Sequence, residues 1–395
     1  MITAAAMPVL VALPAAASLA GFAQAGLGLR AARTFRKTPR TKTSTCPGVT
    51  VLKPLHGDEI LLTEALTSFC QLDWPNLQIL CGVASPHDRA IAVVERLQAA
   101  YPHMRLDLVV NATVHGHNRK VSNLINMLPF AAHDVLVMSD SDMHVAPDYL
   151  RHVTATLGQP GTGLVTSYYV GRRPRAGLIA NLASAHIAQI FVPGALLARA
   201  LGRQDCLGAT MALTRQTLDA AGGLHALLPF VADDAVLGRA VTALGLAVRV
   251  APTIPATTLA ETTPAALWHH ELRWARTVRS VEPLGFAASI LQFPLVFAAL
   301  TAILLGPTPA AFTLLALCFA LRAGLGRAIE IALTAPKTPL WLSPLREALS
   351  VVVWVAAHTG NRVAWRGEIL ATISPHHATP PDISLANATA EGPRR

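Results

Sequence analysis

The sequence predicts an α/β domain with a parallel sheet, flanked by transmembrane helices. Between residues 49 and 139, short apolar strands alternate with helical segments, which is typical of βαβ units. Long stretches without a charged side chain lie on both sides of this region. Charged residues make up only 14% of the chain and hydrophobic residues 52%, a balance that indicates membrane segments.

The first membrane segment is expected at residues 1–29, which carry no charge and can span about 30 Å of hydrocarbon. Six basic and no acidic residues follow in a linker at 30–48, so the positive-inside rule places this side in the cytoplasm. A cleaved signal peptide is the alternative, supported by Ala23-Gln24-Ala25, but its positive charges should precede the apolar run. We therefore expect an uncleaved anchor, whose basic linker could also contact anionic headgroups.

The α/β domain is expected at residues 49–280. Its strands are predicted at 49–54, 77–83, 106–110 and 135–138, and its helices at 60–70, 89–100 and 120–128. Polar clusters follow three of these strands, at 53–59, 85–88 and 140–142. Each cluster alone is an ordinary loop, but the carboxyl ends of strands in an open α/β sheet form the edge that binds ligands. Together the clusters predict a binding site at that edge.

Asp140 and Asp142 directly follow the apolar strand 135–138. Two carboxylates one residue apart can both reach a hard divalent cation, which takes its remaining ligands from phosphates and water. This Asp-x-Asp pattern predicts a site for Mg²⁺ or Mn²⁺ that holds a nucleotide diphosphate. A solvated turn is the alternative, because Ser and Asp are common turn residues.

Two further polar groups lie at predicted helix starts. Lys120 and Asn123 are three residues apart on one helix face, and a helix amino end with a lysine suits a phosphate. A solvated basic turn explains them equally well. Asp233 and Asp234 begin another predicted helix. Acids are favoured at the amino end of a helix for structural reasons alone. The alternative is that one of the two is a general base.

The helix predicted around 268–279 carries His270, Arg273 and Arg276 at three-residue intervals, so we expect them to share one face. Arginines on that face could bind a pyrophosphate through paired hydrogen bonds. Alternatively, the helix lies on anionic lipid, since an uncharged stretch follows at once. The metalloprotease motif His-Glu-x-x-His is absent, because Trp274 occupies the position of its second histidine.

Three later stretches extend the membrane part of the chain. Residues 176–200 are nearly uncharged and amphipathic, which favours an interfacial element over a core helix. Residues 283–322 are too long for one span and contain the breaker Gly306-Pro-Thr-Pro309, which predicts a hairpin returning at Arg322 and Arg327. A third membrane or interfacial segment is expected at 341–372, and a disordered tail at 375–395.

The net charge of +9 favours anionic partners such as lipid headgroups or phosphorylated substrates. A nucleic-acid partner is not expected, because no basic helix is interleaved with aromatic residues. The five cysteines lack a CxxC spacing, and we expect them to be free thiols in a reducing compartment.

Taken together, these motifs resemble the family 2/21 nucleotide-sugar glycosyltransferases of the ceramide glucosyltransferase type. The three family aspartates are matched in order by Asp88, Asp140 and Asp234. The segment from His270 to Trp274 lies where the family has (Gln/Arg)-x-x-Arg-Trp, and His270 is a departure at its first position. The resemblance covers residues 1 to 370.

The closer resemblance, carried by the stretches 53–57, 116–124 and 270–277, is to bacterial hopanoid-biosynthesis-associated glycosyltransferases. It implies transfer of one sugar from UDP-GlcNAc to a hopanoid polyol such as bacteriohopanetetrol, by an integral protein of the bacterial inner membrane with a cytoplasmic catalytic domain. A ceramide glucosyltransferase that uses UDP-glucose is the alternative. A processive polysaccharide synthase and a non-enzymatic membrane scaffold are alternatives from other classes.

The resemblance also implies a GT-A, Rossmann-like catalytic domain and inversion at the anomeric carbon. Asp234 is then the expected general base, with Asp233 as its rival. A divalent cation at Asp140 and Asp142 is expected to neutralise charge on the departing diphosphate.

The remaining roles follow from the same resemblance. Arg273, Trp274 and His270 are expected to assist the leaving group. Contacts with the substrates are expected from Pro54, His56, Glu59, Asp88, Lys120, Asn123, Asp140 and Asp233.

Overall fold

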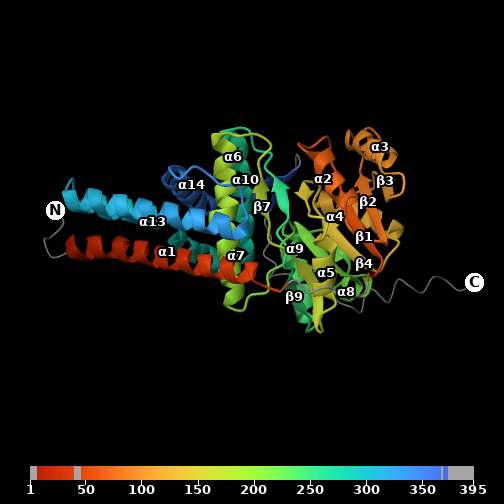
Figure 1. Cartoon of the computed structure of the whole chain (residues 1–395), viewed down its shortest axis with the longest axis horizontal. Helices are drawn as coiled ribbons and strands as arrows, with labels where there is room; N and C mark the ends of the chain where they lie inside the picture. Colours follow the sequence, from red (N-terminus) through yellow and green to blue (C-terminus); the bar gives the residue numbers. More distant parts are fainter. Residues whose placement is uncertain (1–6, 40–45, 366–367, 372–395) are drawn as a thin grey trace, which may run out of the picture.

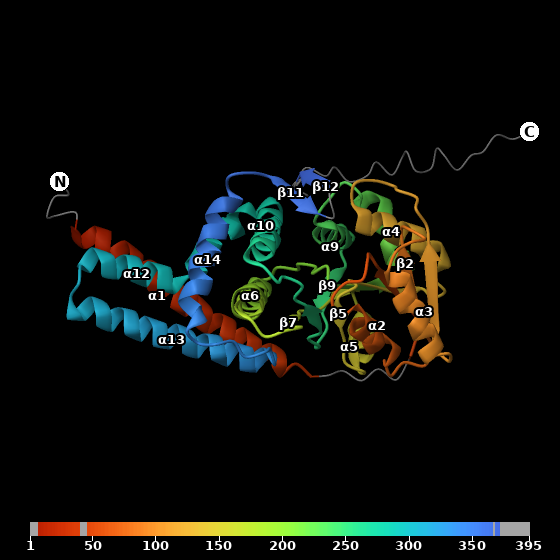
Figure 2. The same cartoon turned by 90° about the horizontal axis from the view of Figure 1, so that it is seen from above.

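The computed structural model describes residues 7–39, 46–365 and 368–371, so the expected tail at 375–395 lies outside the described residues. The molecule is elongated, with a helical bundle at one end and an α/β domain at the other (Figures 1 and 2). The bundle consists of α1 (Met7–Arg36), α12 (Pro294–Leu305) and α13 (Pro309–Leu333), which pack against one another.

A seven-stranded sheet forms the centre of the α/β domain, in the order β3-β2-β1-β4-β8-β6-β9. The strands are β1 (Val49–Pro54), β2 (Leu77–Val83), β3 (Arg105–Val110), β4 (Val135–Ser139), β6 (Thr162–Thr166), β8 (Thr210–Thr214) and β9 (Ala247–Val250). The four strands predicted between 49 and 138 are confirmed to within one residue, and they are parallel. The sheet as a whole is mixed, because β8 runs antiparallel to β4 and β6.

Helices cover both faces of this sheet. Side chains alternate along β1, so that Val49 and Val51 face one apolar layer and Leu52 faces the other. The first layer contains α2 (Leu62–Cys70), α3 (Ala90–Ala100) and α5 (Tyr149–Leu157). The second contains α4 (Arg119–Met127), α8 (Arg215–Ala220) and α9 (Asp233–Ala243), with single 3₁₀ turns at Leu128–Phe130 and Leu224–Leu227. Burial on both faces explains why most residues of the strands are apolar.

A small second sheet brings a distant loop to the carboxyl edge of β4. It consists of β5 (Met143–His144), β10 (Ala256–Thr258) and β7 (Val170–Arg172). The backbone N–H of Thr258 donates to the carbonyl oxygen of Asp142 at 3.0 Å. The loop that continues from β10 therefore starts beside the Asp-x-Asp motif.

Residues 178–200 form one long helix that lies crosswise to α1 and α13 (Figures 1 and 2). It comprises α6 (Leu178–His186), a π-helical turn (Ile187–Phe191) and α7 (Val192–Ala200). By length and composition, α1, α13 and this helix could each cross a membrane. The interfacial position expected for residues 176–200 stays a prediction.

The hairpin expected at 283–322 is longer than predicted and has a bent first arm. That arm consists of α11 (Pro283–Ala288), a 3₁₀ turn (Ser289–Gln292) and α12, with a bend of 59°. The second arm, α13, continues to Leu333 past the expected return at Arg322. Arg322 is buried there, because its Nε lies 2.5 Å from Oε1 of Glu347 and the counterion compensates its charge.

Two other expected boundaries differ from the structure. α1 extends to Arg36, so Arg30 and Arg33 belong to the helix and not to a linker. The segment at 341–372 forms α14 (Leu342–Ala357) and a hairpin of β11 (Arg362–Trp365) and β12 (Glu368–Ala371). α14 is not among the described helices that are long and apolar enough to span a membrane.

A buried ion pair attaches α14 to α10 (Pro264–Val281), the helix that carries His270 and Arg273. Both guanidinium Nη atoms of Arg346 lie 2.6 Å from the carboxylate oxygens of Glu271, and both side chains are buried. α10 begins at a cap in which the Thr263 hydroxyl accepts a hydrogen bond from Ala266 N at 3.1 Å. The cap and the ion pair together determine where α10 lies.

We expect Arg346→Met to lower the free energy of unfolding by about 3–5 kcal/mol, because Glu271 would then be a buried charge without a counterion. The double variant Arg346→Met/Glu271→Leu should recover most of this loss. Unfolding in detergent micelles would measure both, with the exposed Arg175→Met as the control. A loss below about 1 kcal/mol for the single variant would show that the pair contributes little.

Candidate active site

A cavity of about 460 Å³ opens at the carboxyl edge of the sheet, a size typical of small-molecule sites. Its walls come from the loops after β1 and β4, the start of α9, the loop after β10, and helices α6 and α10. Most of the predicted site residues line it: Pro54, Glu59, Lys120, Asp140, Asp142, Asp233, Asp234, His270, Arg273 and Trp274. The structure thus brings together residues that are more than 200 positions apart in the chain.

Three predicted substrate contacts do not line this cavity. Asp88 accepts hydrogen bonds from the backbone N–H of Gly57 at 2.8 Å and of Ala90 at 2.9 Å, and it faces His56 at 3.9 Å. Asn123 is buried and donates to the carbonyl oxygen of Gly82 at 2.8 Å. In this structure, Asp88 and Asn123 hold the loops and helices around the cavity in place.

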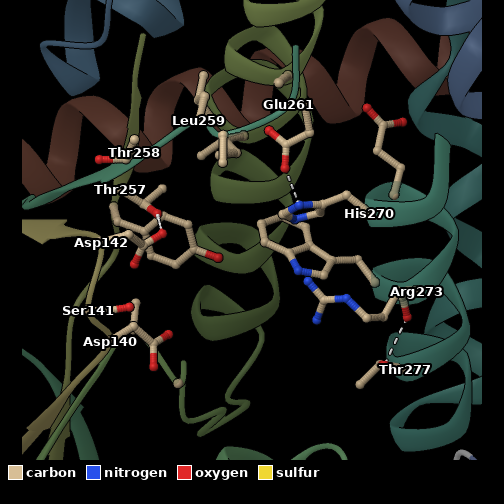
Figure 3. Close-up of a pocket in the computed structure, with 18 of the residues that line it drawn as sticks. Asp140, Ser141, Asp142, Thr257, Thr258, Leu259, Glu261, His270, Arg273 and Thr277 are labelled. Carbon is tan, nitrogen blue, oxygen red and sulfur yellow. Dashed lines mark hydrogen bonds and ion pairs between the residues drawn. The ribbon is translucent and has the colours of Figure 1, made fainter. Parts of the chain in front are cut away.

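The Asp-x-Asp motif forms the acidic side of the cavity (Figure 3). Asp142 accepts a hydrogen bond from the Thr257 hydroxyl at 2.6 Å. Burial, with the adjacent charge of Asp140, raises the pKa of Asp142 to about 6. The buried Lys53 ammonium group donates to the backbone carbonyl oxygen of Asp140, and burial lowers the pKa of Lys53 to about 8. Lys53 therefore holds the backbone of the motif, and Thr257 holds the side chain of Asp142.

Lys120 is a counterion for carboxylates in this structure, where the sequence predicted a contact with phosphate. Its Nζ lies 2.8 Å from Oδ1 of Asp140 and 3.7 Å from Oδ2 of Asp233. Burial opposes its charge, but the two carboxylates outweigh burial and raise the pKa of Lys120. The ammonium group thus joins the Asp-x-Asp motif to the start of α9.

Asp234 lies at the first turn of α9, beside Gly208 of the segment that leads into β8. A Cβ atom at position 208 would lie 3.0 Å from Oδ2 of Asp234, so glycine leaves room for this close approach. Burial, followed by the charge of Asp233, raises the pKa of Asp234 to about 6. A carboxylate with such a pKa is ionised at neutral pH and can accept a proton.

The residues present fit a divalent cation. Asp140 and Asp142 supply oxygen donors of the kind that Mg²⁺ and Mn²⁺ prefer, and the Asp140 side chain is 39% exposed. Within the described part of the chain, no group of three His, Cys, Asp or Glu side chains could hold a metal ion. A cation at this motif would take its other ligands from water and from a bound diphosphate.

The α10 side of the cavity carries His270 and Arg273, opposite the Asp-x-Asp motif (Figure 3). The guanidinium group of Arg273 points into the space between the two sides. Nδ1 of His270 forms an ion pair with Glu261, and the Trp274 ring lies 4.8 Å from the His270 ring between centroids. This side therefore offers a cation and an aromatic surface.

Arg276 does not share this face, so that prediction was wrong. Its Nη1 donates to the carbonyl oxygen of Arg362 at 2.6 Å, away from the cavity. Arg276 follows His270 by six positions, which is about one and two-thirds turns of an α-helix. The two side chains therefore leave the helix in directions about a third of a turn apart. The sequence also missed Glu261, because a single acid in a loop carries no signal of its partner.

Comparison with known proteins identifies the family. The family model for glycosyl transferase family 21 matches residues 13–376. The chain belongs to glycosyl transferase family 21. The prediction of a glycosyltransferase of the ceramide glucosyltransferase type is thereby confirmed for the family, whereas the closeness to hopanoid enzymes stays a prediction.

Two curated relatives of this family 21 protein act on lipids according to their names. Ceramide glucosyltransferase 1 of Caenorhabditis elegans is 24% identical over 201 residues, which are 51% of this chain and 43% of the relative. Beta-monoglucosyldiacylglycerol synthase of Synechocystis sp. is 24% identical over 266 residues, which are 63% of this chain and 53% of the relative. The chain thus spans about half the length of these relatives.

A solved structure confirms the fold. The mannosyltransferase PcManGT from Pyrobaculum calidifontis, in complex with GDP-Man and Mn²⁺, matches with a TM-score of 0.51. It is 21% identical, and the match covers 88% of this chain and 99% of the mannosyltransferase. The predicted α/β fold of the GT-A type, flanked by apolar helices, is therefore confirmed.

We expect Lys120→Met to destabilise this family 21 protein by about 3 kcal/mol at pH 8, because Asp140 and Asp233 would lose their buried counterion. The loss should shrink toward pH 5, since the carboxylates of the variant can then bind protons and stop repelling one another. Thermal unfolding at both pH values would measure it, with the exposed Lys337→Met as a matched control. An equal loss at both pH values would contradict this role.

Proposed function

We propose that this protein transfers a single sugar from a UDP-sugar to a hydroxyl group of a membrane lipid, with inversion at the anomeric carbon. The observation that carries the proposal is the two-sided cavity, in which the Asp-x-Asp motif faces Arg273 (Figure 3) and which Trp274 also lines. Membership of family 21 and the names of the two lipid-modifying relatives support the same reaction class.

The donor diphosphate would lie between the two sides of the cavity. When bound, a divalent cation held by Asp140 and Asp142 would neutralise charge on the diphosphate. Arg273, from the opposite side, can donate paired hydrogen bonds to the same group as it leaves. Glu59 and Pro54, at the end of β1, line the adjoining wall, where we place the nucleoside.

Asp234 is the group we propose as general base. It lines the cavity, and its raised pKa of about 6 suits proton transfer near neutral pH. Asp233 is the poorer choice, because it lies beside the Lys120 ammonium group. The acceptor hydroxyl would give its proton to Asp234 as its oxygen bonds to the anomeric carbon and the bond to the diphosphate breaks.

The acceptor would enter from the membrane side. The crosswise helix contributes Ala183 and Ile187 to the cavity, and Leu259 and Leu267 add apolar surface beside them. A headgroup can thus reach the cavity while its apolar part stays near the bundle, which avoids transfer of that part into water. The sequence resemblance favours a hopanoid polyol with UDP-GlcNAc, at the cytoplasmic face of a bacterial inner membrane. The relatives named for ceramide support ceramide with UDP-glucose as the second candidate.

We expect Asp234→Asn to lower kcat by at least about 100-fold while leaving the Kd for the UDP-sugar unchanged, because the amide cannot accept the proton. In the unchanged protein, kcat/KM should fall as the pH drops below about 6, where Asp234 becomes protonated. Exposed Asp219→Asn is the matched control. Loss of binding together with turnover would instead assign Asp234 a structural role.

Mass spectrometry of lipids would test the proposed reaction directly. Membranes that contain the protein would receive bacteriohopanetetrol and ceramide side by side, each with UDP-GlcNAc or UDP-glucose, with and without Mg²⁺ or Mn²⁺. We expect a metal-dependent product with one added N-acetylhexosamine on the hopanoid. A hexosylceramide would favour the second candidate, products of many sugars would indicate a polymerase, and no product would contradict lipid transfer.

A further inference from the structure

We propose that His270 and Glu261 together bind a second hydroxyl group of the acceptor, next to the hydroxyl that attacks the sugar. The acceptor class would then be lipids with a polyhydroxylated headgroup. This inference rests on the proposed function and adds a specificity site to it. Glu261 lies in the loop after β10, nine positions before His270, and both side chains line the same cavity.

The pair lies on the acceptor side of the cavity. The His270 ring extends from the wall that α10 forms into the cavity, opposite the Asp-x-Asp motif (Figure 3). His186 and Ile187 of the crosswise helix line the same cavity, and so does Leu267, one turn before His270 on α10. The acceptor, which the proposed function places beside Ile187 and Leu267, would therefore lie next to His270.

Glu261 orients the imidazole ring. The Glu261 side chain is only 9% exposed and forms an ion pair with Nδ1 of His270, whose own side chain is 32% exposed. Burial opposes the negative charge of Glu261, but the hydrogen bond from His270 outweighs burial and lowers the pKa of Glu261. The ring edge also contacts Trp274, at 4.8 Å between ring centroids. Because Nδ1 is bonded to Glu261, Nε2 is the ring nitrogen left for a substrate, and in this proposal it accepts a hydrogen bond from a hydroxyl group.

The charges around this pair favour a hydroxyl over a phosphate. The Glu261 carboxylate offsets any positive charge on the imidazole ring, so the pair has no surplus positive charge that would attract a phosphate. Arg273 and Glu271 of α10 and His186 of α6 are further titratable groups near the pair. Since Arg273 provides the cationic group for a phosphate, the pair suits a neutral hydrogen-bond donor.

The hydroxyl bound here is different from the one that attacks. A hydroxyl group carries one proton, and in the proposed mechanism the attacking hydroxyl directs it to Asp234. A hydroxyl that donates to Nε2 of His270 must therefore be another group of the same headgroup. A lipid with a single free hydroxyl cannot make both contacts.

The test compares acceptors that differ in their number of hydroxyls. The full-length protein in micelles would be supplied with bacteriohopanetetrol, which has several hydroxyls, or with diacylglycerol, which has a single free one. Equilibrium binding of each lipid in the presence of UDP and steady-state transfer would be measured for the unchanged protein and for His270→Phe. The aromatic ring of phenylalanine keeps the contact with Trp274 and removes the hydrogen bond.

We expect His270→Phe to weaken binding of the polyol and to raise its KM by about 10-fold to 100-fold, a larger change than it causes for diacylglycerol or for the UDP-sugar. His270→Gln should restore most of the polyol affinity, because an amide still forms the hydrogen bond. Glu261→Gln should weaken polyol binding less, and should have no further effect in the His270→Phe background. The neighbouring exposed His269→Phe is the matched control and should leave all constants unchanged.

Equal polyol binding by the unchanged protein and His270→Phe would overturn this site. A lower kcat of His270→Gln at unchanged polyol affinity would also overturn it. That result would mean that His270 takes up a proton during the reaction and does not merely accept a hydrogen bond. The proposed function has a different test: it is contradicted if the unchanged protein transfers no sugar to any lipid. In that case the binding of the polyol to the unchanged protein and to His270→Phe would still test the His270–Glu261 site.

Discussion

The contact between the Lys120 ammonium group and the carboxylates of Asp140 and Asp233 is the interaction on which the rest of the site depends. The cavity gathers acids from the end of β4 and from the start of α9, and carboxylates that are buried together repel one another. The Lys120 ammonium group, from the start of α4, compensates carboxylates of both segments. Because it contacts both groups, Lys120 also connects the Asp-x-Asp motif to Asp233, the residue next to the proposed general base Asp234.

The two sides of this cavity carry different functional groups. The sheet edge supplies carboxylates and the proposed contacts with the nucleotide, whereas α10 supplies Arg273, Trp274 and His270. α10 is not part of the sheet, so its position depends on other contacts. The buried pair of Glu271 with Arg346 attaches it to α14, next to the bundle. The site is therefore assembled from the α/β domain and from the elements that join it to the membrane part.

The crosswise helix at 178–200 connects the membrane part to the site. It packs against α1 and α13, and its side chains form part of the cavity wall. In the proposed function, this helix would lie along the membrane surface and would bring lipid headgroups and the cavity to the same depth.

Local apolar patterns and residue types at short spacing were enough to predict the strands at 49–54 and 77–83, the order of the motifs and the family. They also predicted that Asp140 and Asp234 lie at the ends of a strand and a helix. The pairing of Lys120 with carboxylates, the burial of Arg322 against Glu347 and the contact of Glu261 with His270 became visible only in the folded chain. Each of these is a charge pair between distant segments. A charged residue in a sequence shows its sign but not its counterion, and the fold alone selects that partner.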